Sequence, residues 1–247
     1  MCVICQGDEK VLNKITYLEC TECKDLKVIP SLPNAWSILC CGCTNLQTIH
    51  PQPSLVFLNC RDCINLEEIH ILPVLEELEC SGCIKIQKLP ILPSLGYLYC
   101  NNCPSLKEIP VFPVLDTLSC DGCTSLETIP SISSLDYLSC YKCKIQSIPP
   151  LSKLSSLECS RCPNLIDIPI FPSLVEIYDY NNDDWIPATP YSGWILGFMR
   201  KFIKRREMKN RLRRYIKSES YREYCIQFYK QKYNRDMERL EKWIEKV

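Results

Sequence analysis

The chain has few glycines, almost no histidine and no long apolar run. Of its 247 residues, 7 are glycine and 2 are histidine. The most apolar window, from Trp194 to Ile203, contains Arg200 and Lys201. It is shorter than the ~18 to 20 apolar residues that cross a bilayer. We therefore expect no membrane span.

Signals for secretion and for catalysis are also missing. The opening MCVICQGDEK has neither the basic start nor the long apolar stretch of a secretory signal, and no Asn-x-Ser/Thr sequon occurs. We therefore expect a cytoplasmic protein whose thiols are mostly reduced. No Ser-His-Asp pattern, glycine-rich phosphate loop or metalloprotease motif is present, and His50 and His70 occupy equivalent repeat positions. The sequence predicts a protein that is not an enzyme and needs no cofactor.

Disorder is excluded by composition, and the charges are segregated. Apolar residues make up 46% of the chain, enough for a sizeable core. Residues 1–190 carry 12 Lys and Arg against 22 Asp and Glu, whereas residues 191–247 carry 17 against 7. The net charges of −10 and +10 indicate two modules joined near NNDDWIPATP.

The cysteines follow a repeat of 20 residues. Eighteen of the 20 fall in nine Cys-x-x-Cys pairs, whose first members stand at positions 2, 20, 40, 60, 80, 100, 120, 140 and 159. Aligned segments such as LGYLYCNNCPSLKEIP and LDTLSCDGCTSLETIP share the pattern LPxLxxLxCxxCxxLxxIP. A fixed period over this length predicts a solenoid of stacked units.

This pattern resembles the leucine-rich repeat, with cysteine at the turn position and in place of the third leucine. The paired LP and IP dipeptides are most similar to the short LPX-type repeats of bacterial effectors, and similar cysteine-bearing repeats occur in giant DNA viruses. The resemblance implies an α/β repeat solenoid, a leucine-rich repeat horseshoe with a parallel β-sheet and few convex helices. If the source is viral, it implies the host cytoplasm or the virion as the location.

Local patterns add detail to this fold. Leu98 and Cys100 alternate with Tyr97 and Tyr99, so one short strand per unit buries a leucine and a cysteine. The prolines hold the return segments extended and leave room for at most single helical turns. The expected parts are an N-terminal cap, eight repeats, a C-terminal cap with linker, and a basic α-helical tail, at residues 1–10, 11–169, 170–190 and 191–247.

The cysteine pairs have three interpretations. Buried cysteine columns that pack between leucine columns are favoured, because every pair occupies inward repeat positions. A disulfide ladder is disfavoured by the strand spacing of ~4.8 Å, which exceeds the ~3.8 Å between the Cβ atoms of a disulfide. Zinc is the third interpretation, since two such pairs match a Cys₄ site. The units lack distinct ligand loops, and we expect no metal.

Specificity should come from the concave face. We predict a partner-binding site there whose members are large aromatic and acidic residues: Tyr17, Phe57, Glu77, Glu79, Tyr97, Tyr99, Asp121, Tyr137 and Tyr141. Aromatic residues anchor protein interfaces, and the acids would favour a basic partner. The alternative is that the rings only stabilise the sheet face.

From Trp194 the periodicity becomes helical. An apolar stripe that includes Ile195, Met199 and Phe202 is opposed by basic residues. We predict that the tail docks through Arg200, Lys201, Lys204, Arg205, Arg206, Arg213 and Arg214. A basic amphipathic segment can dock on an acidic protein surface, including its own repeats, or bind nucleic acid or an anionic membrane.

The sequence therefore predicts a non-catalytic scaffold for protein–protein interaction. Two alternatives stay open. One is a structural or assembly component, such as part of a giant-virus particle, that self-associates through acidic solenoid and basic tail. The other is nucleic-acid binding through the tail.

Overall fold

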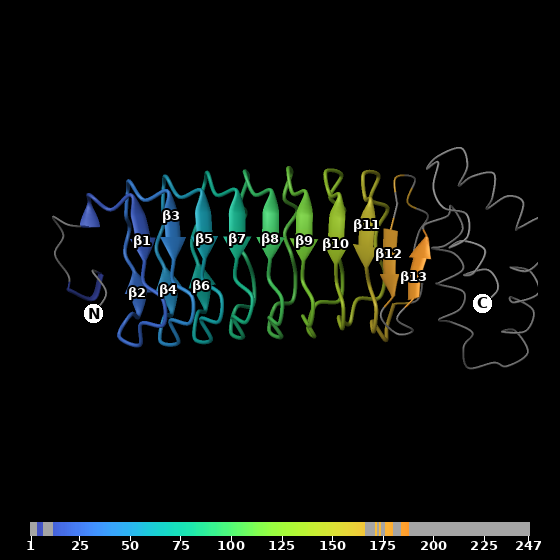
Figure 1. The fold of residues 1–247 in the computed structure, drawn as a ribbon, viewed down its shortest axis with the longest axis horizontal. Coiled ribbons are helices and arrows are strands. Elements are labelled where there is room, and N and C mark those ends of the chain that lie inside the picture. The colour runs from blue at the N-terminus through green and yellow to red at the C-terminus, as the bar shows by residue number, and fades with distance from the viewer. Residues whose placement is uncertain are drawn as a thin grey trace, which may run out of the picture.

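The chain forms a solenoid of stacked parallel strands (Figure 1). The structure is a computed structural model that describes residues 4–6, 12–165, 171, 173, 176–179 and 184–187. Each 20-residue unit contributes one three-residue strand to a single sheet, and neighbouring units pair in register. The prediction of one short parallel strand per unit is confirmed.

The sheet has ten strands, and all but the last run parallel. In spatial order they are β1 (Tyr17–Glu19), β3 (Ser37–Leu39), β5 (Phe57–Asn59), β7 (Glu77–Glu79), β8 (Tyr97–Tyr99), β9 (Thr117–Ser119), β10 (Tyr137–Ser139), β11 (Ser156–Glu158), β12 (Glu176–Asp179) and β13 (Asp184–Pro187).

A second, smaller sheet was not foreseen from the sequence. It joins the return segments of the first three units through β2 (Val28–Ile29), β4 (Thr48–Ile49) and β6 (Glu68–Ile69), again in parallel. Extended return segments at the strand spacing can pair wherever their amide and carbonyl groups face each other. Helix is nearly absent from the described residues, which contain one 3-10 turn, η1 (Ile4–Gln6). No helix among them is long and apolar enough to cross a membrane.

The core consists of side-chain columns that run along the solenoid. The middle residue of each three-residue strand of the large sheet is buried, as the repeat predicts. These residues are Leu18, Ile38, Leu58, Leu78, Leu98, Leu118, Leu138 and Leu157. Both cysteines of each pair from Cys40 to Cys162 are buried beside this column. Gln52 is fully buried at a position where other units place Leu, Ile or Phe. Its side chain accepts from the Leu32 amide at 2.8 Å and donates to the carbonyl of Pro30 at 2.7 Å, so its polar atoms are satisfied.

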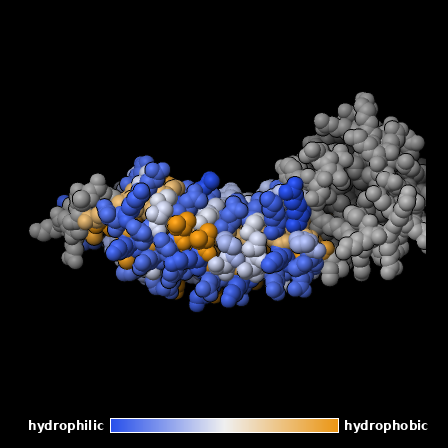
Figure 2. All heavy atoms as spheres, turned by 90° about the horizontal axis from the view of Figure 1, so that it is seen from below, coloured by the Kyte–Doolittle hydropathy of each residue, from blue (hydrophilic) through white to orange (hydrophobic). Residues whose placement is uncertain are grey.

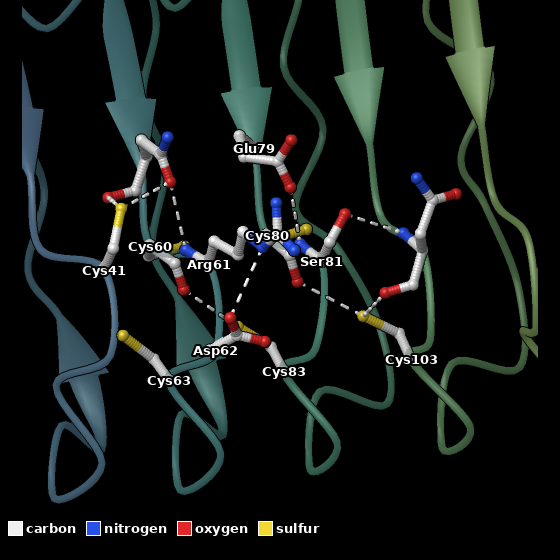
Figure 3. A network of polar contacts seen from close by, with 12 residues as sticks. Cys41, Cys60, Arg61, Asp62, Cys63, Glu79, Cys80, Ser81, Cys83 and Cys103 are labelled. Atoms are coloured by element: carbon white, nitrogen blue, oxygen red, sulfur yellow. Dashed lines mark hydrogen bonds and ion pairs between the residues drawn. The ribbon is translucent and has the colours of Figure 1, made fainter.

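A ladder of thiol hydrogen bonds joins successive units. From Cys43 onward, the second cysteine of each pair donates its S–H to the backbone carbonyl of the first cysteine in the preceding unit. Cys83 reaches Cys60 at 3.1 Å and Cys103 reaches Cys80 at 3.3 Å (Figure 3). The same bond recurs from Cys43 to Cys20, Cys63 to Cys40, Cys123 to Cys100, Cys143 to Cys120 and Cys162 to Cys140. The thiols therefore contribute hydrogen bonds to carbonyl groups that the turns bury, in addition to filling volume.

From Cys23 onward, the residue before each second cysteine has a left-handed backbone. Glycine occupies this position in alternate units, at Gly42, Gly82 and Gly122, and its φ is +67°, +76° and +70°. A Cβ on Gly122 would lie 2.6 Å from Oδ1 of Asn102 in the preceding unit. Larger side chains therefore alternate with glycine along this column until Lys142 and Arg161 follow each other.

The two ends of the sheet differ. β12 continues the parallel order after β11, whereas β13 turns back and pairs antiparallel with β12. Pro187, the last residue of β13, pairs with Glu176, the first residue of β12. Figure 1 shows β13 pointing toward the edge at which the other strands begin. The predicted helical tail, residues 191–247, lies outside the described residues.

The thiol ladder predicts the cost of removing one donor. Cys123→Ala should lower the free energy of unfolding by about 1 to 3 kcal/mol, because it opens a cavity and leaves the Cys100 carbonyl without its S–H donor. Cys123→Ser keeps a donor and should cost less. Denaturant unfolding of both variants, with exposed Thr124→Ala as the control, measures the difference. Equal losses for Ala and Ser would contradict a role for the hydrogen bond.

The left-handed column predicts coupling between neighbouring units. Gly122→Ala should destabilise the chain by about 1 to 2 kcal/mol from backbone strain alone, with a further loss from the contact with Asn102. In an Asn102→Gly background that contact is gone, so Gly122→Ala should cost less. A double-mutant cycle measured by denaturant unfolding gives the coupling energy. Additive losses would refute the contact.

Candidate protein-binding face

The open side of the ten-stranded sheet carries the side chains that could meet a partner. We call it the strand face; it corresponds to the concave face of the sequence analysis. In β1, for example, Leu18 points inward while Tyr17 and Glu19 point out, and the other strands up to β11 repeat this alternation with buried middle residues. The strand face is therefore built from the first and third residues of each strand, followed by the residue after the first cysteine.

Large and small side chains alternate across the middle of this face. Tyr97, Thr117 and Tyr137 are paired in register on β8, β9 and β10. Tyr97 is 45% exposed and Tyr137 is half-buried. At the strand spacing of ~4.8 Å, the two tyrosines stand about 10 Å apart with the shorter threonine between them. Because threonine is shorter than tyrosine, the surface of the face is lower at Thr117 than at the two tyrosines beside it.

Acidic side chains adjoin the tyrosines. Glu77 and Glu79 on β7 pair in register with Tyr97 and Tyr99 on β8. Burial raises the pKa of Tyr99, and the negative charges of Glu77 and Glu79 raise it further. Burial also raises the pKa of Glu158 on β11, as does the charge of Asp121. In both cases a neighbouring carboxylate adds to the effect of burial.

Two of the predicted site acids also have structural roles. Glu79 accepts from the Ser81 amide at 2.9 Å, and the Ser81 hydroxyl accepts from the amide of Asn101 at 3.0 Å (Figure 3). Asp121 continues this pattern one unit beyond Asn101: its Oδ1 accepts from the Tyr141 amide at 2.7 Å and from the Ser139 hydroxyl at 2.6 Å. Each of these two carboxylates thus has one oxygen committed to the solenoid.

Tyr141 is also partly engaged within the chain. The ammonium of Lys142 lies 5.0 Å from its ring centroid, and the guanidinium of Arg161 lies 5.6 Å away. Both cations are within the range of a cation–π interaction. The structure therefore places Tyr141 among cations at one margin of the strand face, while Tyr97, Tyr99 and Tyr137 occupy its middle.

Beside the N-terminal part of the face, at the edge where the strands begin, lies an aromatic residue that the sequence reasoning missed. Trp36 is 53% exposed, and its ring centroid lies 6.3 Å from that of Tyr17. Tyr17 also donates to Glu19 at 3.1 Å, and Phe57 is half-buried on β5. Trp36 precedes its strand by one residue, a position that the alternation rule does not assign to the face. The sequence signal for it was a tryptophan directly after Ala35, which replaces the first leucine of the repeat.

The opposite surfaces are different in character. Figure 2 shows the edge beneath the strands, where the cysteine turns lie, as a hydrophilic surface with a compact hydrophobic patch near its middle. Two exposed isoleucines, Ile64 and Ile84, directly follow the second cysteines of neighbouring units on this edge. Within the part of the chain that the structure describes, no group of three or more His, Cys, Asp and Glu is arranged to hold a metal ion.

The predicted docking residues of the tail lie outside the described residues: Arg200, Lys201, Lys204, Arg205, Arg206, Arg213 and Arg214.

The described cysteines of the Cys-x-x-Cys pairs are buried except for two near the N-terminus, and Cys41, outside the pairs, is half-buried. Among the described residues no disulfide forms. The hydrogen bond with the Cys123 thiol, together with burial, raises the pKa of Cys100 well above its usual value. Cys5 and Cys23 are half-buried, with their sulfur atoms 3.7 Å apart. Burial alone would raise the pKa of Cys23, but hydrogen bonds from the Asp25 amide and from Cys5 lower it.

This division predicts a difference in thiol reactivity. The thiolate is the reactive form, so iodoacetamide should modify Cys5 and Cys23 of the folded, reduced chain well before Cys100 or Cys120. The modification of Cys23 should also begin at lower pH than that of Cys100, because the pKa of Cys23 is lowered and that of Cys100 is raised. Peptide mass spectrometry after timed alkylation gives the order, and denatured protein is the control. Equal rates in the folded state would show that burial does not protect the columns.

Comparison with known proteins finds no match for this chain: no protein-family model and no curated protein matches it. The functional interpretation accordingly rests on the side chains of the strand face and of the solenoid edges.

Proposed function

We propose that the chain is a non-catalytic interaction scaffold of the leucine-rich repeat type, which binds a protein partner on the strand face. The observation that carries the proposal is the in-register series Tyr97, Thr117 and Tyr137, with Glu77 and Glu79 beside it. Large aromatic side chains supply much of the energy of protein interfaces, and the lower surface at Thr117 offers room for a partner side chain.

The charge of the face supports a basic partner. Burial, and after it the charge of nearby carboxylates, raises the pKa of Tyr99 and of Glu158, so acidic groups lie close together at two places on the face. A lysine- or arginine-bearing surface would be attracted to it, chiefly through faster association at low salt. Short strands that stack in register present this surface as a rigid array, which limits the entropy lost on binding.

The experiment removes the two central tyrosines. The immobilised full chain captures partners from native cytoplasm, and the main partner is then purified and titrated calorimetrically. Tyr97→Ala with Tyr137→Ala should weaken its affinity by about 30-fold or more, as expected when a hot spot of about 2 kcal/mol is lost. Neither tyrosine is part of the core, so the melting temperature should change little.

An aromatic control lies beside the other end of the same face. Trp36→Ala removes an exposed ring that is not a member of the predicted site and lies at its N-terminal end. This control should bind the partner with an affinity close to that of the parent chain. If the control loses binding and the central variant keeps it, the site is centred on the N-terminal units and the assignment to Tyr97 and Tyr137 is wrong.

A further inference from the structure

The edge at which the strands begin carries an exposed aliphatic stripe. Ile71, Ile91 and Val111 occupy the same position in three successive units and are 63%, 70% and 61% exposed. In the turns just before β7 and β9, Val74 and Val114 are 40% and 51% exposed. In the units on either side, the equivalents of Ile71 are Ser31, Pro51, Ser131 and Pro150, and aliphatic residues return at this position only near the ends of the repeats, at Val11 and Ile170. We call this region, with its acidic neighbours, the start edge.

Two valines of the start edge replace a residue that stabilises neighbouring turns. At the equivalent position, Ser54 donates to the carbonyl of Pro33 at 2.7 Å and Ser94 donates to that of Pro73 at 3.2 Å. Val74 and Val114 have no donor and so cannot make this bond. They expose apolar surface in a place where serine would give the fold a hydrogen bond, which indicates that their side chains serve contact with another segment.

Carboxylates border the aliphatic surface. Glu76, Asp116 and Asp136 are exposed immediately before β7, β9 and β10. No lysine or arginine occurs in residues 70–77, 90–97, 110–117 or 130–137, which form this edge in the four units concerned. An apolar strip lined by negative charge is complementary to an amphipathic segment that carries positive charge.

The topology brings such a segment to this edge. Because β13 runs antiparallel, Pro187 lies beside Glu176, at the edge where the parallel strands begin. The residues from 188 onward therefore start from the edge that carries Val114 and Asp136. Four strand spacings, about 19 Å, separate β9 from β13. The six residues between β13 and residue 194, 188–193, can span about 20 Å when extended.

We propose that residues 194–206 of the same chain dock on the start edge. This stretch, WILGFMRKFIKRR, combines the apolar Ile195, Met199 and Phe202 with five basic residues. As a helix it would extend about 20 Å, enough to cross from Val114 to Val74. Its apolar side chains cover the aliphatic stripe while its cations face Glu76, Asp116 and Asp136. The docking leaves the strand face open for its own partner.

The test uses trypsin, because all of its sites within 194–206 follow the basic residues proposed to dock. In the full chain, docked residues should be cleaved slowly, at a rate set by the population of the undocked state. Val74→Ser with Val114→Ser should speed cleavage within 200–206 by about ten-fold or more. Serine is the residue that Ser54 and Ser94 supply at this position, so the fold should be retained. Glu76→Gln, Asp116→Asn and Asp136→Asn should act in the same direction.

The matched control lies on the opposite edge. Ile64→Thr with Ile84→Thr also removes two exposed aliphatic side chains, and Thr44 and Thr124 occupy the equivalent positions in other units. This variant should be cleaved at the rate of the parent chain. Equal cleavage of the parent chain and the start-edge variants would overturn the proposal. Protection that rises with protein concentration together with a dimeric mass, or that needs added RNA, would overturn it too, because the occupant would then be a second copy or a nucleic acid.

Discussion

Stacking at the strand spacing is the constraint on which the rest of this structure depends. The units repeat every ~4.8 Å, and the columns between them are buried. The polar groups of each turn must therefore find hydrogen-bond partners in the neighbouring unit. Cysteine suits this place, since it is small and apolar, yet carries an S–H donor. The bonds from Cys63 to Cys40 and from Cys83 to Cys60 show the same donor meeting the same acceptor in successive units. The repetition of cysteine is thus explained by packing and hydrogen bonding together.

The same constraint decides which positions are available for function. Gly82 and Gly122 are fixed by the side chains of Asp62 and Asn102 in the preceding units, because a Cβ would collide with their oxygens. On the strand face, one carboxylate oxygen of Asp121, Oδ1, accepts hydrogen bonds from an amide and a hydroxyl of the next unit. The variable residues that can specify a partner are therefore fewer than the exposed positions of the repeat.

Much of the fold could be predicted from the period of 20 residues, because a residue count fixes which side chains stack. It gave the buried leucine and cysteine columns and the parallel strands. It could not identify hydrogen-bond partners, which depend on distances between units. Three hydrogen bonds are of this kind: the one that Cys103 donates, the one that buried Gln52 accepts, and the one that Glu79 accepts from a backbone amide. The alternation rule found Tyr97 and Tyr137 on the strand face, but it missed Trp36, which lies one residue outside its strand.

The last strand connects the architecture to the basic segment that follows. A solenoid of parallel strands ends in unpaired amide and carbonyl groups, which invite another strand to pair. β13 covers one such edge at β12, and its antiparallel direction also reverses the chain. A parallel β13 would have delivered the chain to the edge of the cysteine turns, where Ile64 and Ile84 are exposed. The antiparallel strand ends instead at the edge where β9 and β10 begin, directly after Asp116 and Asp136 in the order of the chain. One change of strand direction therefore covers the edge of β12 and ends the described chain at the edge where the parallel strands begin.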